Sequence, residues 1–323
     1  MRLIKKLVDL LFWSLLLVFG LCFVSDSAAV LFDERIGTPL RIAISYPMGA
    51  FFVPVFEIMV IGVPLLLIFL LADGRIFGVI SVAKLLIAAY IVTLGIPARV
   101  PPRIAVASEP TSEQYALAAD IVCKRLWELP VPQGDTVAEA AVAAAEYAER
   151  ELGVEQAIPP RIKASLAPAI IADMGIVAYY AFPTAEIITC TDAPDFMTVF
   201  STAHETMHFF GVANEDEANL FALAALLDSG NESLEYSAYL CAFVYVGSAL
   251  CTEDRDTYDK IYAKLPDFAR ESLDERTSFL KRGEGRLGSV SDVLNDVALT
   301  LRDPRGAESY SYTSRLVVEY LLQ

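Results

Sequence analysis

The chain has 323 residues, 55% of them hydrophobic, yet it carries 25 Lys and Arg against 41 Asp and Glu, a net charge of −16. High hydropathy and high net charge rarely occur together in one soluble domain. Residues 1–97 hold 7 basic and 6 acidic side chains, whereas residues 98–323 hold 18 and 35. The sequence therefore predicts a membrane anchor over 1–97 and an acidic domain over 98–323. The acidic balance argues against nucleic acid or an anionic membrane surface as a partner, because both attract basic patches.

Three apolar stretches in the first 97 residues, at about 7–24, 46–72 and 76–97, are long enough to predict membrane spans. The first follows Arg2, Lys5 and Lys6, and an alternative is that it belongs to a cleaved signal peptide. Its length exceeds the usual apolar region of about 7–15 residues in such peptides, which favours a span. In either case a basic, cytoplasmic amino terminus would leave the acidic domain outside the cytoplasm.

Two ionisable residues lie within the second and third predicted spans, Glu57 and Lys84. Charged residues inside a membrane are often functional. The simpler interpretation is that Glu57 lies near the outer interface and that Lys84 extends its amine toward the inner one.

Capping patterns, glycines and hydrophobic periodicity predict a mainly helical, α+β domain after residue 98. Two neighbouring β-rich segments, near 176–180 and 185–191, predict a small antiparallel pair of strands. The remaining segments are expected to be helices, at about 111–128, 136–153, 165–173, 195–210, 214–228, 233–250, 254–264, 267–281, 289–301 and 309–321.

The only two histidines of the chain, His204 and His208, are four residues apart in an HExxH motif. On a helix this spacing puts both imidazoles on one face, where they can bind one zinc ion. Glu205 lies beside them, and its carboxylate is expected to act as general base on a water molecule that the zinc activates. The alternative is a helix with two incidental histidines.

A catalytic zinc site needs a third protein ligand. Gly211 should end the motif helix, and a new helix should begin near Asn214. We predict Glu215 as the third ligand, with Glu217 as the alternative and Asn219 as a supporting residue one turn later. Acids at a helix amino terminus also complement the helix dipole, which is the plainer explanation of this cluster.

Two related classes of protease are disfavoured. Enzymes with the HExxHxxGxxH motif have a third histidine where Asn214 stands and need a later methionine turn, but no Met follows Met207. An intramembrane protease is disfavoured because the motif segment is short and is flanked by acidic residues.

The HExxH motif followed by Glu-x-x-Ala-Asn resembles the gluzincin peptidases, including the Ste-type and ImmA/IrrE-type enzymes. The chain is more closely similar to an uncharacterised bacterial family of membrane proteins, a domain-of-unknown-function family with three amino-terminal spans and a carboxy-terminal HExxH domain. The matching segments are 174–177 with Tyr180, 182–186, 204–219, 236–240 and 311–312. This resemblance implies a zincin-like fold and a zinc peptidase in the bacterial cytoplasmic membrane. Many relatives have Gly where this chain has Ala185.

Other residues are weaker candidates for the site. Glu186 lies on a predicted strand, and in zincin-like folds the edge of such a strand binds an extended substrate. Glu186 is therefore a candidate for binding substrate or supporting the metal site, or an ordinary exposed residue. Tyr236 and Tyr239 are candidate donors to an oxyanion, although packing residues are the commoner interpretation. The five cysteines show no CxxC spacing and are expected to be free thiols.

These observations together predict a multi-pass membrane protein with an extracytoplasmic, zincin-like metallopeptidase domain that hydrolyses peptides or proteins. The alternative function is a non-catalytic metal-binding or sensory membrane protein that retains the HExxH motif. A third possibility is a structural membrane protein with an incidental motif.

Overall fold

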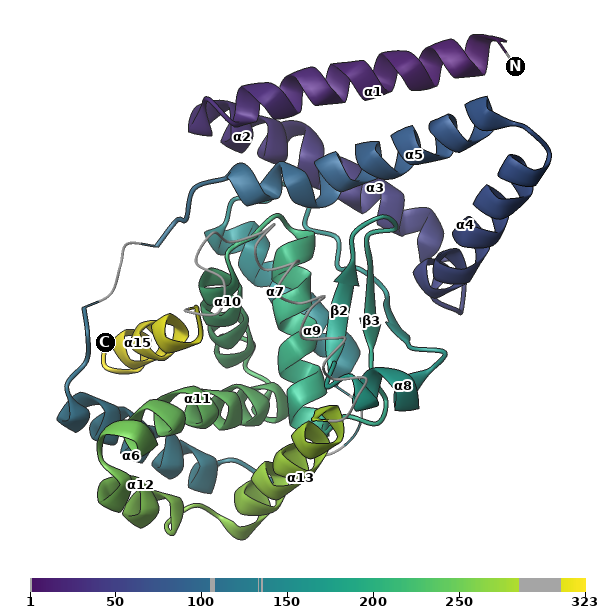
Figure 1. Cartoon of the computed structure of the whole chain (residues 1–323). Coiled ribbons are helices and arrows are strands. Elements are labelled where there is room, and N and C mark those ends of the chain that lie inside the picture. Colours follow the sequence, from purple (N-terminus) through teal and green to yellow (C-terminus); the bar gives the residue numbers. More distant parts are fainter. Residues whose placement is uncertain (1, 105–107, 133, 135, 285–308) are drawn as a thin grey trace.

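The computed structural model of the chain describes residues 2–104, 108–132, 134, 136–284 and 309–323 (Figure 1). The amino-terminal helices lie together at the top of the view, and the other helices and one small sheet form the region beneath them. The amino-terminal elements are α1 (Arg2–Cys22), α2 (Asp26–Phe32), η1 (Asp33–Gly37), α3 (Thr38–Met48), α4 (Val55–Ala72), α5 (Ile76–Tyr90), η2 (Ile91–Gly95) and η3 (Pro97–Arg99).

Among the described residues, three helices are long and apolar enough to cross a membrane. Two of them, Val55–Ala72 and Ile76–Gly95, correspond to the second and third predicted spans. The third is α11 (Glu232–Glu253), but 67% of its apolar window is buried inside the carboxy-terminal region, so it is a core helix there. The first predicted span falls on α1, which is helical and exposes large apolar side chains such as Trp13 and Leu17.

The second predicted span begins too early. Residues 46–48 end α3, residues 49–54 form a connection, and the apolar helix α4 begins at Val55. Pro54 precedes the first residue of α4, a place where its missing N–H is tolerated. The short helices over residues 26–48 were not expected from hydropathy, because they are too short and polar to resemble spans.

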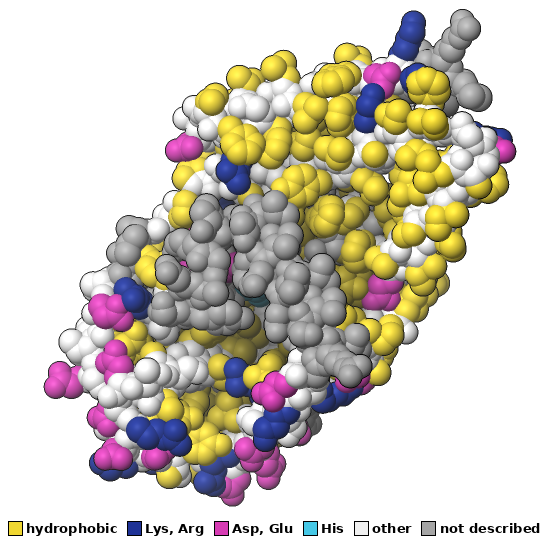
Figure 2. Space-filling model, viewed as in Figure 1, with side chains coloured by type: hydrophobic (Ala, Val, Ile, Leu, Met, Phe, Trp, Pro, Cys, Tyr) yellow, Lys and Arg dark blue, Asp and Glu magenta, His cyan; other side chains and the backbone are white. Residues whose placement is uncertain are grey.

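The apolar surface is concentrated on the amino-terminal helices. Figure 2 shows hydrophobic side chains covering α1, α4 and α5, while charged side chains gather on the opposite end of the molecule. No residue of α4 is buried, and Ile61, Leu65 and Ile68 are each more than half exposed. The exposed apolar side chains are therefore concentrated at one end of the molecule and the charged side chains at the other. Lys84 of α5 has a partner across the helices, because its Nζ lies 2.6 Å from Oδ1 of Asp9 on α1.

The carboxy-terminal region consists of helices around a three-stranded sheet. Its elements are α6 (Ser112–Glu128), α7 (Val137–Glu151), β1 (Ile162–Ala164), α8 (Pro168–Asp173), β2 (Ala178–Ala181), β3 (Glu186–Thr189), α9 (Asp195–Phe209), α10 (Glu215–Leu227), α11, α12 (Arg255–Tyr262), α13 (Asp267–Gly283) and α15 (Ser309–Leu321). The helices agree with the predicted ones to within a few residues. The predicted helix at 289–301 lies outside the described residues.

The sheet has the order β1-β3-β2. The predicted antiparallel pair is confirmed as β2 and β3, with Tyr180 opposite Ile187. The sequence did not indicate β1, which pairs in parallel with β3. As a result β3 is the central strand, and all four of its residues are buried. In the turn before β3, Ala185 has a φ of 51°, a left-handed conformation that glycine adopts more easily.

Helix α9 lies at the centre of the region, where it packs against α7, α10 and α11 and lies next to the sheet (Figure 1). On α7, Ala140, Ala144 and Ala148 are spaced four apart and fully buried, so that their small side chains allow α9 to approach closely. The five cysteines are all free, as expected, and four of them are buried.

Candidate metal centre

The two histidines project from the last two turns of α9. The helix ends at Phe209, just before Gly211, as the sequence predicts. Gly211 has a φ of 94°, a conformation that favours glycine. The N–H of Gly211 donates to the carbonyl of His208, and the N–H of Val212 donates to that of Met207, both at 3.0 Å. This pair of bonds is the Schellman motif. It turns the chain back so that Val212 passes over the side chain of His208.

The turn fixes the tautomer of His208. Its Nδ1 lies 2.6 Å from the carbonyl oxygen of Val212. A carbonyl oxygen only accepts hydrogen bonds, so the proton of the neutral imidazole is on Nδ1. The lone pair of Nε2 is then available to a metal, and a backbone carbonyl orienting the ring is the usual arrangement for a histidine ligand.

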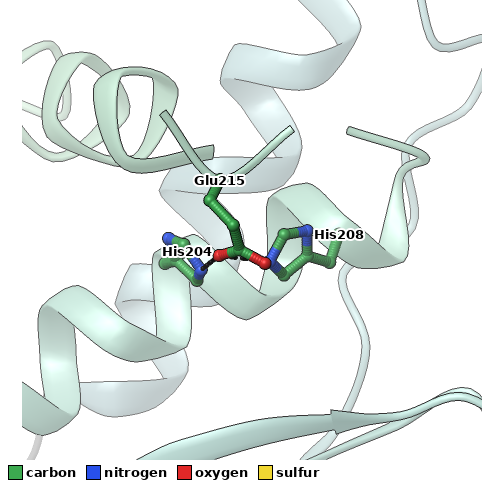
Figure 3. A group of neighbouring side chains, drawn as sticks. All are labelled: His204, His208 and Glu215. Atoms are coloured by element: carbon green, nitrogen blue, oxygen red, sulfur yellow. Dashed lines mark ion pairs between the residues drawn. The ribbon is translucent and has the colours of Figure 1, made fainter. Parts of the chain in front are cut away.

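Glu215 is delivered to the histidines by the start of the next helix. Asn214 caps α10, because its side-chain oxygen accepts the N–H of Glu217 at 3.0 Å. Glu215 is the first residue of the helix, and its carboxylate points between the two imidazoles (Figure 3). Its Oε2 lies 3.2 Å from Nε2 of His204 and 3.4 Å from Nε2 of His208.

One ligand atom from each of these three residues lies within 4.8 Å of the others. Burial alone would raise the pKa of Glu215, but the adjacent imidazoles hold that pKa well below its ordinary value. A lowered pKa favours the ionised carboxylate, which is the form that binds a metal. Two imidazoles and one carboxylate form the donor set of many catalytic zinc sites, so these residues fit zinc.

Glu205 lies next to His204 on α9 and is bound to the sheet. Its Oε2 accepts the backbone N–H of Tyr180 at 2.8 Å. Strand β2 is at the side of the sheet nearest α9. The N–H of Cys190 donates to the carbonyl of Val177, so these two residues form a hydrogen-bonded pair at the end of the β2–β3 ladder. Hydrogen-bonded and non-hydrogen-bonded pairs alternate along an antiparallel ladder, so Tyr180 and Ile187 form a non-hydrogen-bonded pair. The N–H of Tyr180 therefore points away from β3 and toward α9.

The other acids near the start of α10 have structural contacts. Glu217 is buried, and its Oε1 accepts the backbone N–H groups of Arg103 and Ile104. It thus secures the segment that follows the apolar amino-terminal helices. Asp216 is fully buried and accepts the hydroxyl of Thr313 on α15 at 2.7 Å.

Asn219 belongs to the same network as Asp216. Its Nδ2 donates to Thr313, and its Oδ1 accepts the hydroxyl of Tyr245 on α11. These bonds hold the first turn of α10 between α11 and α15, and so they support the position of Glu215 indirectly. The i, i+3 spacing of Asp216 and Asn219 was a local signal that could have drawn attention to this pair.

Glu186 does not lie at the edge of the sheet, contrary to the expectation that its strand presents an edge to substrate. It is buried on the central strand β3, where its Oε1 lies 2.6 Å from Nζ of Lys163. Its two carboxylate oxygens also accept the first N–H groups of α4, those of Val55 and Phe56 at 3.0 and 2.8 Å. Glu186 therefore caps the apolar helix α4. The sequence did not indicate Lys163 as its partner, because β1 was not foreseen.

Tyr236 and Tyr239 have contacts elsewhere. The hydroxyl of Tyr236 lies 2.9 Å from that of Ser272 on α13. The Tyr236 side chain also lines a cleft of about 740 Å³ near the amino-terminal end of α9. Tyr239 interacts with Arg125 on α6. Among the described contacts, neither tyrosine is brought to the cluster of His204, His208 and Glu215.

The pKa of Glu186 gives a prediction about acid stability. Burial opposes ionisation, but Lys163, Thr184 and the two backbone N–H groups of α4 lower the pKa below its ordinary value of 4.5. A lowered folded pKa means that the stabilisation is complete above the unfolded pKa and is lost as pH falls through the folded one. We expect the Tm of Glu186→Gln to fall less than that of the wild type between pH 5 and 3. Equal acid slopes, measured by thermal unfolding in detergent, would contradict this assignment.

The structure thus defines a mainly helical protein with apolar helices long enough to cross a membrane and a His-His-Glu cluster beside its sheet. The chain belongs to the family described as "Protein of unknown function (DUF3810)", which it matches over residues 36–318. No curated protein and no solved structure matches the chain.

Proposed function

We propose that the protein is a membrane-anchored zinc metallopeptidase of the gluzincin type, with a zincin-like carboxy-terminal domain. The observation that carries this proposal is the convergence of Nε2 of His204, Nε2 of His208 and Oε2 of Glu215, directly beside Glu205. His204, His208 and Glu215 would hold the ion. Zinc bound there would supply a Lewis acid for a peptide carbonyl and would acidify a water molecule.

The roles of the protein side chains follow from their positions. Glu205 is the general base that takes a proton from the attacking water, and it later delivers that proton to the leaving amine. Its bond to Tyr180 N–H holds the carboxylate through one oxygen, so the other can exchange the proton. An extended peptide next to β2 would present its backbone to this carboxylate.

The arrangement in the membrane is part of the proposal. The basic residues near the start of α1 favour a cytoplasmic position in a bacterial cell, and three crossings by α1, α4 and α5 would then leave the carboxy-terminal domain outside it. Its substrates are then peptides or proteins of the extracytoplasmic space.

The choice of Glu215 rather than Glu217 as ligand can be tested by two matched substitutions. Glu215→Gln should reduce the zinc content of the purified protein from about one ion per chain to a small fraction, since a neutral amide is a poor zinc ligand. Glu217→Gln should retain the zinc, because an amide oxygen can still accept the N–H groups of residues 103 and 104.

The metal content of both variants would be measured by inductively coupled plasma mass spectrometry. Loss of zinc from Glu217→Gln alone would overturn the ligand assignment. A wild-type protein that binds no zinc when it is supplied would overturn the metallopeptidase proposal as a whole.

A further inference from the structure

The candidate site is joined on one side to the start of membrane helix α4 through strand β2. The hydroxyl of Tyr179 donates to Oε1 of Glu57, in the first turn of α4, at 2.9 Å. The next residue, Tyr180, donates its backbone N–H to Glu205. Successive residues of a strand are only about 3.3 Å apart. Two neighbouring residues of β2 therefore contact the start of α4 and the candidate general base, respectively.

Further bonds fix the start of α4 to the sheet. Glu57 also accepts the hydroxyl of Ser165 at 2.5 Å and the N–H of Leu166 at 2.7 Å. Lys163, which is paired with Glu186, donates to the carbonyls of Met48 and Val53 just before the helix. These are charge-assisted bonds in a mostly buried position, so the helix has little freedom to swing away from the sheet.

On the other side, the end of α9 is joined to the end of the third predicted span. The carbonyl of Phe209, the residue after His208, accepts Nε of Arg41 at 2.7 Å. The same guanidinium donates to the carbonyl of Val92, near the end of the apolar segment Ile76–Gly95, at 3.2 Å. The site therefore lies between the start of one membrane helix and the end of the next. Because these helices form a hairpin, both points are on the same side of the bilayer.

Exposed apolar side chains surround the base of α4 outside the helix itself. Phe51 and Phe52 precede it and are 53% and 87% exposed, while Leu166 and Ile170 on the sheet side are 56% and 54% exposed. Arg161 stacks over the ring of Phe52 at 5.3 Å. Exposed apolar side chains beside the end of a membrane helix can be buried in lipid, while a neighbouring arginine keeps its charged group in water. This part of the carboxy-terminal domain is therefore suited to lie in the interface rather than above it.

We propose that the substrates are membrane-anchored polypeptides, cleaved in the segment that leaves the bilayer next to a transmembrane helix. This inference rests on the proposed peptidase function and adds the substrate class. A chain that emerges from lipid beside α4 would meet β2, Glu205 and the metal ligands within a few residues. A soluble protein would need to approach a site that faces the interface.

The test is a set of reporters reconstituted with the full-length, zinc-loaded protein in liposomes. Each reporter carries the same randomised scissile segment, and the cleavage products are read by mass spectrometry. The first is free in solution, and the second has the segment directly after a transmembrane helix. In the third, a helical spacer of about 20 residues lifts the segment roughly 30 Å from the bilayer. In the second the same spacer follows the segment, so that length and composition are matched.

We expect cleavage of the second reporter to be at least about tenfold faster than that of the free segment, and the lifted segment to lose most of this gain. Equal rates for the lifted and the membrane-proximal segments would overturn the inference while leaving the peptidase function intact, since co-localisation alone would then explain the gain. Faster cleavage of the free segment would overturn it as well. If no reporter is cut, or if Glu205→Gln cuts them all at wild-type rates, the proposed function itself fails.

Discussion

Glu205→Gln is expected to lower the rate of peptide hydrolysis by about 10²–10⁴-fold, the usual contribution of a general acid–base residue. The zinc should stay bound, because Glu205 is not among the three residues whose ligand atoms converge. The fold should also be preserved. A glutamine keeps a side-chain oxygen that can accept the N–H of Tyr180, so the bond between α9 and β2 is retained and only the ability to take a proton is lost.

The measurement combines the zinc content with the rate of cleavage of a denatured casein in detergent. Glu215→Gln serves as the matched control, since it should lose both zinc and activity. Three outcomes are informative. Unchanged activity in Glu205→Gln would refute its role as base. A wild-type protein that holds zinc but cuts neither casein nor the membrane reporters would favour the alternative, a non-catalytic metal-binding or sensory protein. Loss of zinc from Glu205→Gln would mean that Glu205 itself supports the metal.

The grouping of His204, His208 and Glu215 could be predicted because each step depends on local chemistry. The i, i+4 spacing sets the two imidazoles on one face, Gly211 ends the helix, and Asn214 starts the next one. Only one tight turn lies between the two helices, so the position of the first residue of α10 relative to α9 is strongly restricted. Such short-range rules need no knowledge of the rest of the fold.

The residues that join the site to the membrane helices could not be predicted in the same way. Strand β1 has only three residues, and its parallel pairing with β3 depends on contacts distant in sequence. Without β1, the sequence left Glu186 as either a residue that binds substrate or supports the metal site, or an ordinary exposed one. In the structure it is buried against Lys163 and caps α4. Arg41 and Phe209 are 168 positions apart. Hydropathy also gave no reason to examine residues 25–45, which are neither long nor apolar enough for a span.

Arg41 and Asp33 form a buried salt bridge, and Arg41 joins this pair to the carboxy-terminal region through the carbonyl of Phe209. The Arg41 side chain is fully buried, and its Nη1 lies 2.7 Å from Oδ1 of Asp33, with Nη2 3.1 Å from Oδ2. Nη2 also donates to Thr38. Gly211 passes so close that a Cβ at that position would lie 2.3 Å from Asp33 and 2.5 Å from Arg41. The pair is thus packed directly under the turn that follows the HExxH helix.

Arg41→Ala should destabilise the protein by about 3–5 kcal/mol, because it leaves the carboxylate of Asp33 buried without its counter-ion. It also removes the donor to the carbonyl of Phe209 at the end of α9, so we expect weaker zinc binding together with a lower Tm. Arg35→Ala is the matched control. Arg35 lies six residues earlier, and its pair with Glu155 is exposed and 3.4 Å long, so its loss should have little effect.

Thermal unfolding of the zinc-loaded protein in detergent, followed by metal analysis, would measure both effects. The double variant Arg41→Met with Asp33→Leu distinguishes a general packing defect from an uncompensated charge. If the buried charge is the main cause, the double variant should recover much of the stability that Arg41→Ala loses, since replacing both partners by apolar residues is often neutral. It should not recover zinc affinity fully, because the bond to Phe209 is still missing. Equal Tm values for Arg41→Ala and Arg35→Ala would show that this pair does not hold α9 against the amino-terminal helices.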